Sequence, residues 1–293
     1  MLPRMTLEGL LSLKALLTGG ALLIFLAWER LWPAAESPLL ARFGHASRAA
    51  WRRLARNLGL FGINLALSPL VVLPITIWAT GFELGLRPAW WGGWPGLLLD
   101  LLLLDFWIYW WHRANHEVPW LWRFHEVHHL DELLDSTTAL RFHFGEVLLS
   151  ALARALVIVL FDFPLSSVLV FETLLLTGTI FHHSDARLPP RLEPALARVI
   201  ITPSIHWVHH HARRADTDSN YGTIFSFWDP LFRSKSRTRR WLTMPIGVEG
   251  RRERPLLQLI ATPFERRPWG GRADAQDGAG LPTMKPAPRS SRQ

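Results

Sequence analysis

The sequence predicts an all-α, integral membrane helical bundle with a cytoplasmic, histidine-rich cap that holds two metal ions. Hydrophobic residues make up 49% of the 293 residues, and long apolar runs alternate with polar, basic or histidine-rich stretches. Twelve of the thirteen histidines lie between His112 and His211. Long apolar runs are typical of membrane helices, and imidazoles gathered in this way are typical of a metal site.

Five apolar runs predict membrane helices, at about 10–28, 58–80, 95–111, 146–161 and 165–181. The last two are short and are separated only by Asp162-Phe163-Pro164, a turn signal. They therefore predict a helical hairpin that dips into the bilayer instead of fully crossing it. The first run carries Lys14 and lacks a small-residue cleavage site, so we interpret it as an anchor and not as a removed signal peptide.

The distribution of arginine predicts the orientation in the membrane. The loop from Gly81 to Trp94 holds only Arg87 and should be external, whereas the segment after the first run is rich in arginine and should be cytoplasmic. Every grouped histidine then lies near the cytoplasmic surface, of a bacterial inner membrane or of an endoplasmic reticulum membrane. The arginines of the basic segment are Arg30, Arg42, Arg48, Arg52, Arg53 and Arg56.

These patterns divide the chain into three parts. Residues 1–94 hold the N-terminal membrane helices and the basic loop, and residues 95–245 form the histidine-rich catalytic domain, which includes the hairpin at 146–181. Residues 246–293 are basic and rich in proline, which predicts disorder.

The composition excludes several classes of site. The chain has no cysteine, which rules out disulfides, thiolate-held zinc, iron–sulfur clusters and a thiol nucleophile. His, Asp and Glu remain as strong metal ligands. The net charge of +8 is explained by membrane orientation and anionic lipid, so we expect no nucleic acid as a partner.

Three charged residues inside the predicted spans require partners. Arg154 and Glu172 lie at about equal distances from the hairpin turn, so we predict that they form an ion pair; the alternative is a shallow hairpin whose arginine reaches the interface. Asp105 lies seven residues before His112 on the same helical face. It is either a packing residue or a carboxylate that orients a metal-bound imidazole, and we favour the second interpretation.

The spacing of the histidines predicts how they converge. Residues three and four apart on a helix are neighbours on one face, so each group presents two or three nitrogens toward a common point. Three such helices can enclose two metal ions. The groups are His112 with His116, His125 with His128 and His129, and His206 with His209 and His210.

Spacing does not choose the metal, because neutral imidazoles suit zinc, copper, iron and nickel alike. A pair of irons fits best, with zinc as a substitute, because a site at a lipid boundary with many neutral donors can bind O2 and attack a hydrocarbon.

In order along the chain, these motifs resemble the fatty acid hydroxylase and sterol desaturase superfamily, over about residues 100 to 232. The resemblance rests on Asp105-x-Trp107-x-Tyr109, His112-Arg113-x2-His116, His125-x2-His128-His129, Phe181-His182-His183-Ser184, Pro203-x2-His206-x2-His209-His210, Asn220-Tyr221-Gly222 and Trp228-Asp229.

This resemblance implies a membrane di-iron enzyme that uses O2 to hydroxylate or desaturate a fatty acyl, sterol or isoprenoid lipid. It implies a separate electron-donor protein, because no His-Pro-Gly-Gly element of a fused cytochrome b5 domain is present. The implied ligands are His112, His116, His125, His128, His129, His183, His206, His209 and His210.

Other positions depart from the family pattern or have open roles. His143 lies where the family often shows Arg-x-His-Pro-x-Glu but Phe144 replaces the proline, so it is a ligand, a residue behind a ligand or a packing residue. We interpret His182 as a bystander or outer donor, and Asn220 as a turn or support residue.

Two alternative functions compete with the oxygenase. His125-Glu126-x2-His129 fits the HExxH motif of a zinc metalloprotease, in which Glu126 is the general base, but this leaves the second HxxHH group unused. A membrane metal carrier would need polar residues along a path across several spans, whereas these histidines gather at one face.

Overall fold

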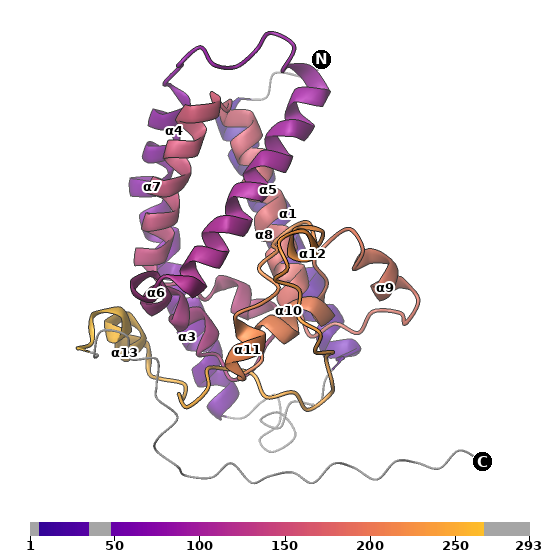
Figure 1. Cartoon of the computed structure of the whole chain (residues 1–293). Helices are drawn as coiled ribbons and strands as arrows, with labels where there is room; N and C mark the ends of the chain where they lie inside the picture. The colour runs from indigo at the N-terminus through magenta and orange to yellow at the C-terminus, as the bar shows by residue number, and fades with distance from the viewer. Residues whose placement is uncertain (1–5, 35–47, 267–293) are drawn as a thin grey trace.

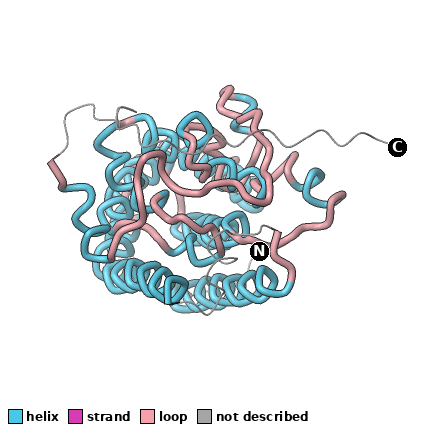
Figure 2. The backbone as a smooth tube through the Cα atoms, turned by 90° about the horizontal axis from the view of Figure 1, so that it is seen from below, coloured by secondary structure: helices cyan, strands magenta, loops and turns pink. Residues whose placement is uncertain are grey.

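The computed structural model describes residues 6–34 and 48–266 of the chain. These residues form helices, turns and loops, with three isolated bridge pairs and no strand among them (Figure 2). The predicted all-α fold is confirmed. Arg42 of the basic segment and the last part of the predicted disordered tail lie outside the described residues.

Long helices form the upper part of the molecule in Figure 1. Ser68–Val72 is one π-helical turn that joins α3 to α4, where Pro69 and Pro74 contribute no backbone N–H to a regular ladder. The long helices are α1 (Leu7–Leu31), α3 (Arg48–Leu67), α4 (Leu73–Thr80), α5 (Gly93–Glu117), α7 (Phe144–Phe161) and α8 (Leu165–His183).

By length and composition, four helices of the described chain can cross a membrane: Leu7–Leu31, Arg48–Thr80, Phe144–Phe161 and Leu165–His183. The run at 95–111 lies in α5, which is 25 residues long but is not among the four. Its buried Asp100 and Asp105 lower its hydropathy, and both carboxylates are bonded to other parts of the fold.

Helices α7 and α8 form the expected hairpin, and its turn is bonded to another part of the fold. Asp162, at the turn, accepts hydrogen bonds from the backbone N–H groups of Leu84 and Leu86, at 2.8 and 2.9 Å. The hairpin turn therefore reaches the loop between α4 and α5, at the far end of the bundle. By length and composition, both hairpin helices are also long and apolar enough to cross a bilayer.

The core lies between these helices. Side chains from four helices and the hairpin turn meet in one apolar cluster, which fixes the hairpin against α4 and α5. Its buried members are Ala79, Leu104, Ile108, Ala155, Ile158, Phe163, Val168 and Phe171.

Short helices and loops form a cap at the lower end of the long helices (Figure 1). Arg53 of α3 is buried and binds Asp131 and Asp135 of the cap, at 2.6 and 2.7 Å, so it faces protein and not lipid. The short elements are α6 (Pro119–His129), η2 (Ser136–Leu140), α9 (Leu192–Leu196), α10 (Pro203–His209), α11 (Arg214–Thr217), α12 (Trp228–Leu231), α13 (Leu256–Ala261) and η3 (Thr262–Phe264).

The described part of the C-terminal segment is folded where disorder was expected. Leu259 of α13 is fully buried and packs in a cluster with Leu60 of α3, Val127 of α6 and Leu130 at the end of α6. A six-residue helix carries too few residues for periodicity to show in the sequence, and its stability comes from this tertiary packing. Residues 267–293 lie outside the described chain.

Candidate metal centre

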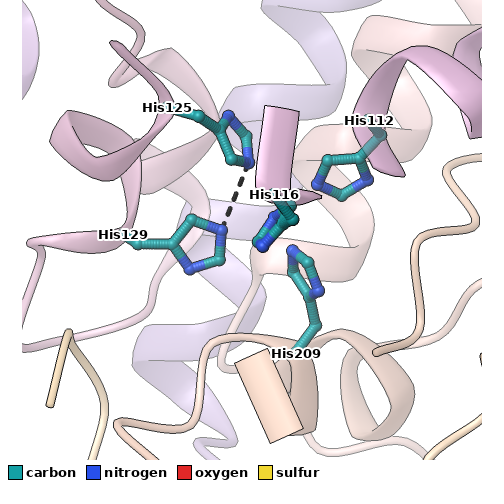
Figure 3. Close-up of side chains that lie close together, drawn as sticks. All are labelled: His112, His116, His125, His129 and His209. Carbon is teal, nitrogen blue, oxygen red and sulfur yellow. Dashed lines mark hydrogen bonds between the residues drawn. The ribbon is translucent and has the colours of Figure 1, made fainter. Parts of the chain in front are cut away.

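Nine buried histidines form two adjacent groups in the cap. Within each group, one nitrogen from every ring lies within 4.8 Å of the others. The five-histidine group (Figure 3) contains His112, His116, His125, His129 and His209. The four-histidine group contains His128, His183, His206 and His210.

Helix geometry explains how α6 and α10 each serve both groups. In α6, His125 and His129 are four residues apart and share the five-histidine group, while His128 points to the other group. The segment of α10 reverses this division. His206 and His210 share the four-histidine group and His209 joins the first. Each HxxHH motif therefore contributes two histidines to one group and one histidine to the other.

Stacking joins the two groups. The rings of His129 and His210 are stacked, with centroids 4.2 Å apart and planes 19° apart, although they belong to different groups. The centroids of His128 and His210 lie 4.8 Å apart within the four-histidine group. The two groups are thus in direct contact through stacked rings and form one continuous site.

Backbone oxygens fix the tautomer of several rings. The Nδ1–H of His112 donates to the carbonyl oxygen of Tyr221, at 2.8 Å, and that of His209 to Ser219, at 2.7 Å. Donation from Nδ1 leaves the Nε2 lone pair free to bind a metal, which is the arrangement that metal-binding histidines use. In the four-histidine group, His128 donates in the same way to Arg141 and His183 to Thr179, at 3.1 and 2.8 Å.

Glu146 gives His125 an anionic partner. The Nδ1 of His125 lies 2.8 Å from Glu146 Oε1, and both side chains are buried. A carboxylate behind a metal-binding imidazole orients the ring and raises its basicity. Glu146 is the last residue of the Arg-x-His-x-x-Glu motif in the sequence, but the spacing of that motif did not indicate that Glu146 pairs with His125.

The distances between Nε2 atoms fit a metal ion. His183 Nε2 lies 3.0 Å from Nε2 of both His128 and His206. Since His128 and His183 carry their protons on Nδ1, their Nε2 lone pairs face each other, and this contact becomes favourable when a cation lies between them. Two nitrogens that each lie about 2.1 Å from a metal ion, with a right angle between the two nitrogen–metal bonds, are about 3.0 Å apart.

Buried nitrogens without a hydrogen-bond partner in the five-histidine group also indicate a metal site. Both ring nitrogens of His116, and Nε2 of His209, are buried without a hydrogen-bond partner in the described chain. Buried polar atoms are normally paired, so these orphans indicate a ligand. The donor set therefore fits metal ions at both groups.

Burial keeps the imidazoles of α6 and α10 neutral. Desolvation is the largest cause, and repulsion from neighbouring imidazoles adds to it, so the pKa of each falls well below the ordinary value of 6.5. Neutral rings are the form that binds metal. The imidazoles concerned are His128, His129, His206, His209 and His210.

His143 and His182, whose roles the sequence left open, lie outside both groups. The Nδ1 of His143 accepts a hydrogen bond from Gly145 N, at 2.9 Å, and so caps α7, while its Nε2 donates to Ile260 O at 3.1 Å. Both ring nitrogens are therefore used by the fold. His182 packs against the site, with its ring centroid 4.0 Å from that of His206.

Asp105 does not orient an imidazole, contrary to the interpretation favoured from the sequence. Its carboxylate accepts from Trp228 Nε1 at 2.7 Å, and from the N–H groups of Ile224 and Phe225 at 3.2 Å each. It thus holds the loop before α12. The sequence had suggested that Asp105 orients an imidazole from a neighbouring helix, but its carboxylate is used by this loop, and the acceptor for His112 is the Tyr221 carbonyl.

Asn220 is a support residue in a left-handed conformation, with φ of 52°. Its side chain donates to Ile205 O at 3.3 Å and accepts from Ser236 N at 3.0 Å. It stands between Ser219 and Tyr221, whose carbonyls hold His209 and His112.

The HExxH glutamate pairs with an arginine and is not a member of either histidine group. Glu126 lies 3.4 Å from Arg251 Nε in a buried ion pair, whereas its neighbours His125 and His129 join the five-histidine group.

Within the helical hairpin, Arg154 Nη2 lies 2.7 Å from Glu172 Oε1. Lys14 of α1 also binds Glu172, a partner that the sequence did not indicate. A single apolar helix gives no sign of which neighbour it will meet.

Comparison with known proteins places the site in a wider group. Residues 97–234 match the family model described as fatty acid hydroxylase. An ornithine lipid hydroxylase from Rhizobium tropici is 30% identical over 59% of this chain and 53% of its own length. An alkylglycerol monooxygenase from Xenopus tropicalis is 34% identical over 55% of this chain and 34% of its own.

A lathosterol oxidase from Homo sapiens is 33% identical over 45% of this chain and 42% of its own length. The matches thus span about half of the ornithine lipid hydroxylase and about a third of the alkylglycerol monooxygenase. No solved structure matches the chain.

Proposed function

We propose that the chain, whose residues 97–234 match the family model described as fatty acid hydroxylase, is a membrane oxygenase that oxidises a lipid with O2. The observation that carries this proposal is the pair of buried, neutral histidine groups at one end of a bundle of apolar helices. An acyl, sterol or isoprenoid chain can reach such a site from the bilayer without entering water.

The two histidine groups would hold one metal ion each, and iron is the element we propose, with zinc as a substitute. Iron bound by these imidazoles would supply the activation of O2. The protein itself holds each ligand ring by its Nδ1 atom, as the contacts of His112 and His209 illustrate, and excludes bulk water. Exclusion of water protects a reactive oxidant from side reactions.

The overall reaction consumes two electrons and two protons. A lipid C–H bond and O2 give a C–OH group and water, or, for desaturation, an alkene and two waters. Hydroxylation is favoured by the relatives named ornithine lipid hydroxylase and alkylglycerol monooxygenase. We propose that the electrons come from a separate protein at the cytoplasmic face of a bacterial inner membrane, or of the endoplasmic reticulum in a eukaryote.

The metalloprotease remains the weaker alternative. Its general base would be Glu126, but this carboxylate pairs with Arg251 and is not a member of the group that contains His125 and His129. A general base must reach the metal-bound water.

Metal analysis and oxygen uptake on the purified, detergent-solubilised protein test the proposal. We expect about two irons per chain and oxygen uptake that depends on reductant and lipid. His128→Ala and His209→Ala, one from each group, should abolish uptake and lower the metal content. His211→Ala is the matched control, because His211 pairs with Asp216 at 2.8 Å outside both groups. One zinc with peptide cleavage, or full turnover in both variants, would contradict the proposal.

A further inference from the structure

The segment that follows α12 carries a row of exposed cations. Residues 233–239 alternate between exposed basic side chains and half-buried hydroxyl side chains, which is the pattern of an extended segment with two different faces. We call this segment the basic strap (orange, after α12 in Figure 1). Its exposed side chains are Arg233, Lys235, Arg237 and Arg239.

The inner face of the basic strap is bonded to the cap. Ser234 Oγ donates to Asp229 Oδ1 at 2.7 Å, and Ser236 Oγ donates to Asp216 Oδ1 at 2.8 Å. The backbone joins as well, because Asn220 N donates to Ser234 O at 2.9 Å and Ser236 N donates to Asn220 Oδ1 at 3.0 Å. The strap is therefore fixed on the surface by its small polar residues.

The loop beneath the strap is the one that holds the five-histidine group. Ser219 and Tyr221, on either side of Asn220, accept the Nδ1–H bonds of His209 and His112. One residue, Asn220, thus separates the strap from the supports of two candidate ligands. A short path of covalent and hydrogen bonds runs from Ser236 through Asn220 and Ser219 to His209.

Most of the exposed charge of the strap is not offset within the fold, although Lys235 has an electrostatic neighbour among the described residues, Asp229. None of the four cations forms an ion pair in the part of the chain that the structure describes. The nearby carboxylates are engaged by other groups, Asp216 by His211 and Asp218 by Arg214. A row of unpaired cations attracts an acidic partner and speeds its association.

We propose that the basic strap is the docking surface for a small, acidic, one-electron carrier protein, which passes electrons along the path through Asn220 toward the metal that the five-histidine group would hold. This inference rests on the proposed oxygenase function. Two carriers, each oxidised by one electron, supply the pair that hydroxylation needs, with two protons from water. The exposed Trp241 beside the strap adds the Arg-and-aromatic composition that protein interfaces favour.

Charge removal on the strap is the first test. The variant Lys235→Gln/Arg237→Gln/Arg239→Gln is compared with Arg187→Gln/Arg191→Gln/Arg198→Gln, which removes the same charge from exposed arginines elsewhere. The probe is a reduced, acidic two-iron ferredoxin, added to the iron-loaded enzyme in nanodiscs. The measurements are its dissociation constant and its rate of oxidation.

We expect the strap variant to bind the ferredoxin at least tenfold more weakly and to oxidise it at least tenfold more slowly at low salt, and the control variant to change little. Binding by the native chain should weaken with added salt, because the screening length is only about 10 Å at 0.1 M. Equal loss in both variants, no loss in the strap variant, or no binding of ferredoxin by the native chain would overturn the docking surface.

Turnover with ascorbate as a small reductant separates the two proposals. The strap variant should keep native ascorbate-driven lipid oxidation, since its substituted residues touch no histidine. Failure of ascorbate-driven turnover in the native chain would instead count against the proposed function.

A spin label provides a readout that is independent of activity. The chain has no cysteine, so Lys235→Cys gives one labelling site. In nanodiscs, the label should be accessible to a water-soluble relaxing agent and become immobilised when ferredoxin is added. A label that is shielded by anionic lipid, and unaffected by ferredoxin, would assign the strap to the membrane surface and overturn the proposal.

Discussion

Each imidazole of the two groups is prepared for metal by what its Nδ1 atom touches. Where Nδ1–H donates to a backbone carbonyl, as in His112 and His183, the ring cannot flip without losing that bond, and Nε2 stays aimed at the group. His125 differs because its partner is the carboxylate of Glu146. A charged acceptor makes a stronger hydrogen bond than a neutral carbonyl.

Replacing Glu146 should therefore weaken metal binding without removing a ligand. We expect Glu146→Ala to lower the metal affinity of the five-histidine group by about 10- to 100-fold, and Glu146→Gln, which can still accept the Nδ1–H bond, to lower it less. Chelator competition with Co²⁺ measures both. The control is Glu117→Ala, whose side chain is 52% exposed and pairs only with Arg113. Native affinity in Glu146→Ala would exclude this role.

At the scale of the elements, the first helix is held to the rest of the bundle by buried charges. Lys14 binds Glu172 in the middle of α8, and Glu29 near the other end of α1 accepts from Ser136 N and Asp185 N, at 3.0 and 3.1 Å. Because α1 is otherwise largely exposed within the molecule, these polar contacts fix its position along α8.

Glu172 is the residue on which this arrangement depends. Glu172→Gln leaves Lys14 and Arg154 without a counterion among apolar helices, and should lower the free energy of unfolding by about 3–5 kcal/mol. Lys14→Met should cost less, because Arg154 still pairs with the carboxylate. Unfolding in mixed micelles checks both, with Glu8→Gln in the exposed first turn as control. Equal stability of all three variants would contradict the argument.

At the scale of the whole molecule, the cap contains buried, neutral imidazoles, and their protonation at low pH should destabilise the fold. The pKa values of His128, His129, His206, His209 and His210 in the folded state lie well below 6.5, so the unfolded chain binds more protons as the pH falls through 6.5. Their contribution to stability is complete above that pH. It is lost below it.

The metal-free protein should accordingly melt at steadily lower temperature between about pH 7 and pH 5, with each buried histidine adding up to about 1.4 kcal/mol per pH unit. Melting curves of chelator-treated protein measure this slope. A His128→Phe/His209→Phe variant should give a shallower slope, because it has two fewer groups to protonate. A melting temperature independent of pH over this range would show that the cluster is not buried neutral.

The sequence predicted more of the elements than of their contacts. Apolar runs predicted the long helices. HxxHH spacing predicted that the rings of one motif converge, which holds for His125 with His129 and for His206 with His210, while the third ring of each motif joins the other group. The division of His128 from His129 into different groups depends on how α6 and α10 cross, which one helix alone does not reveal. Asp105 was misinterpreted because its partners lie 119 to 123 residues away.

Because α6 and α10 each contribute histidines to both groups, the binding of the two metal ions should be linked. Because each helix donates to both groups, an ion that enters one group fixes the rotation of both helices and so orders the rings of the other. The second ion then meets ligands whose ordering entropy has already been lost, and it should bind more tightly than the first. Such a centre fills in pairs, and singly loaded molecules remain scarce.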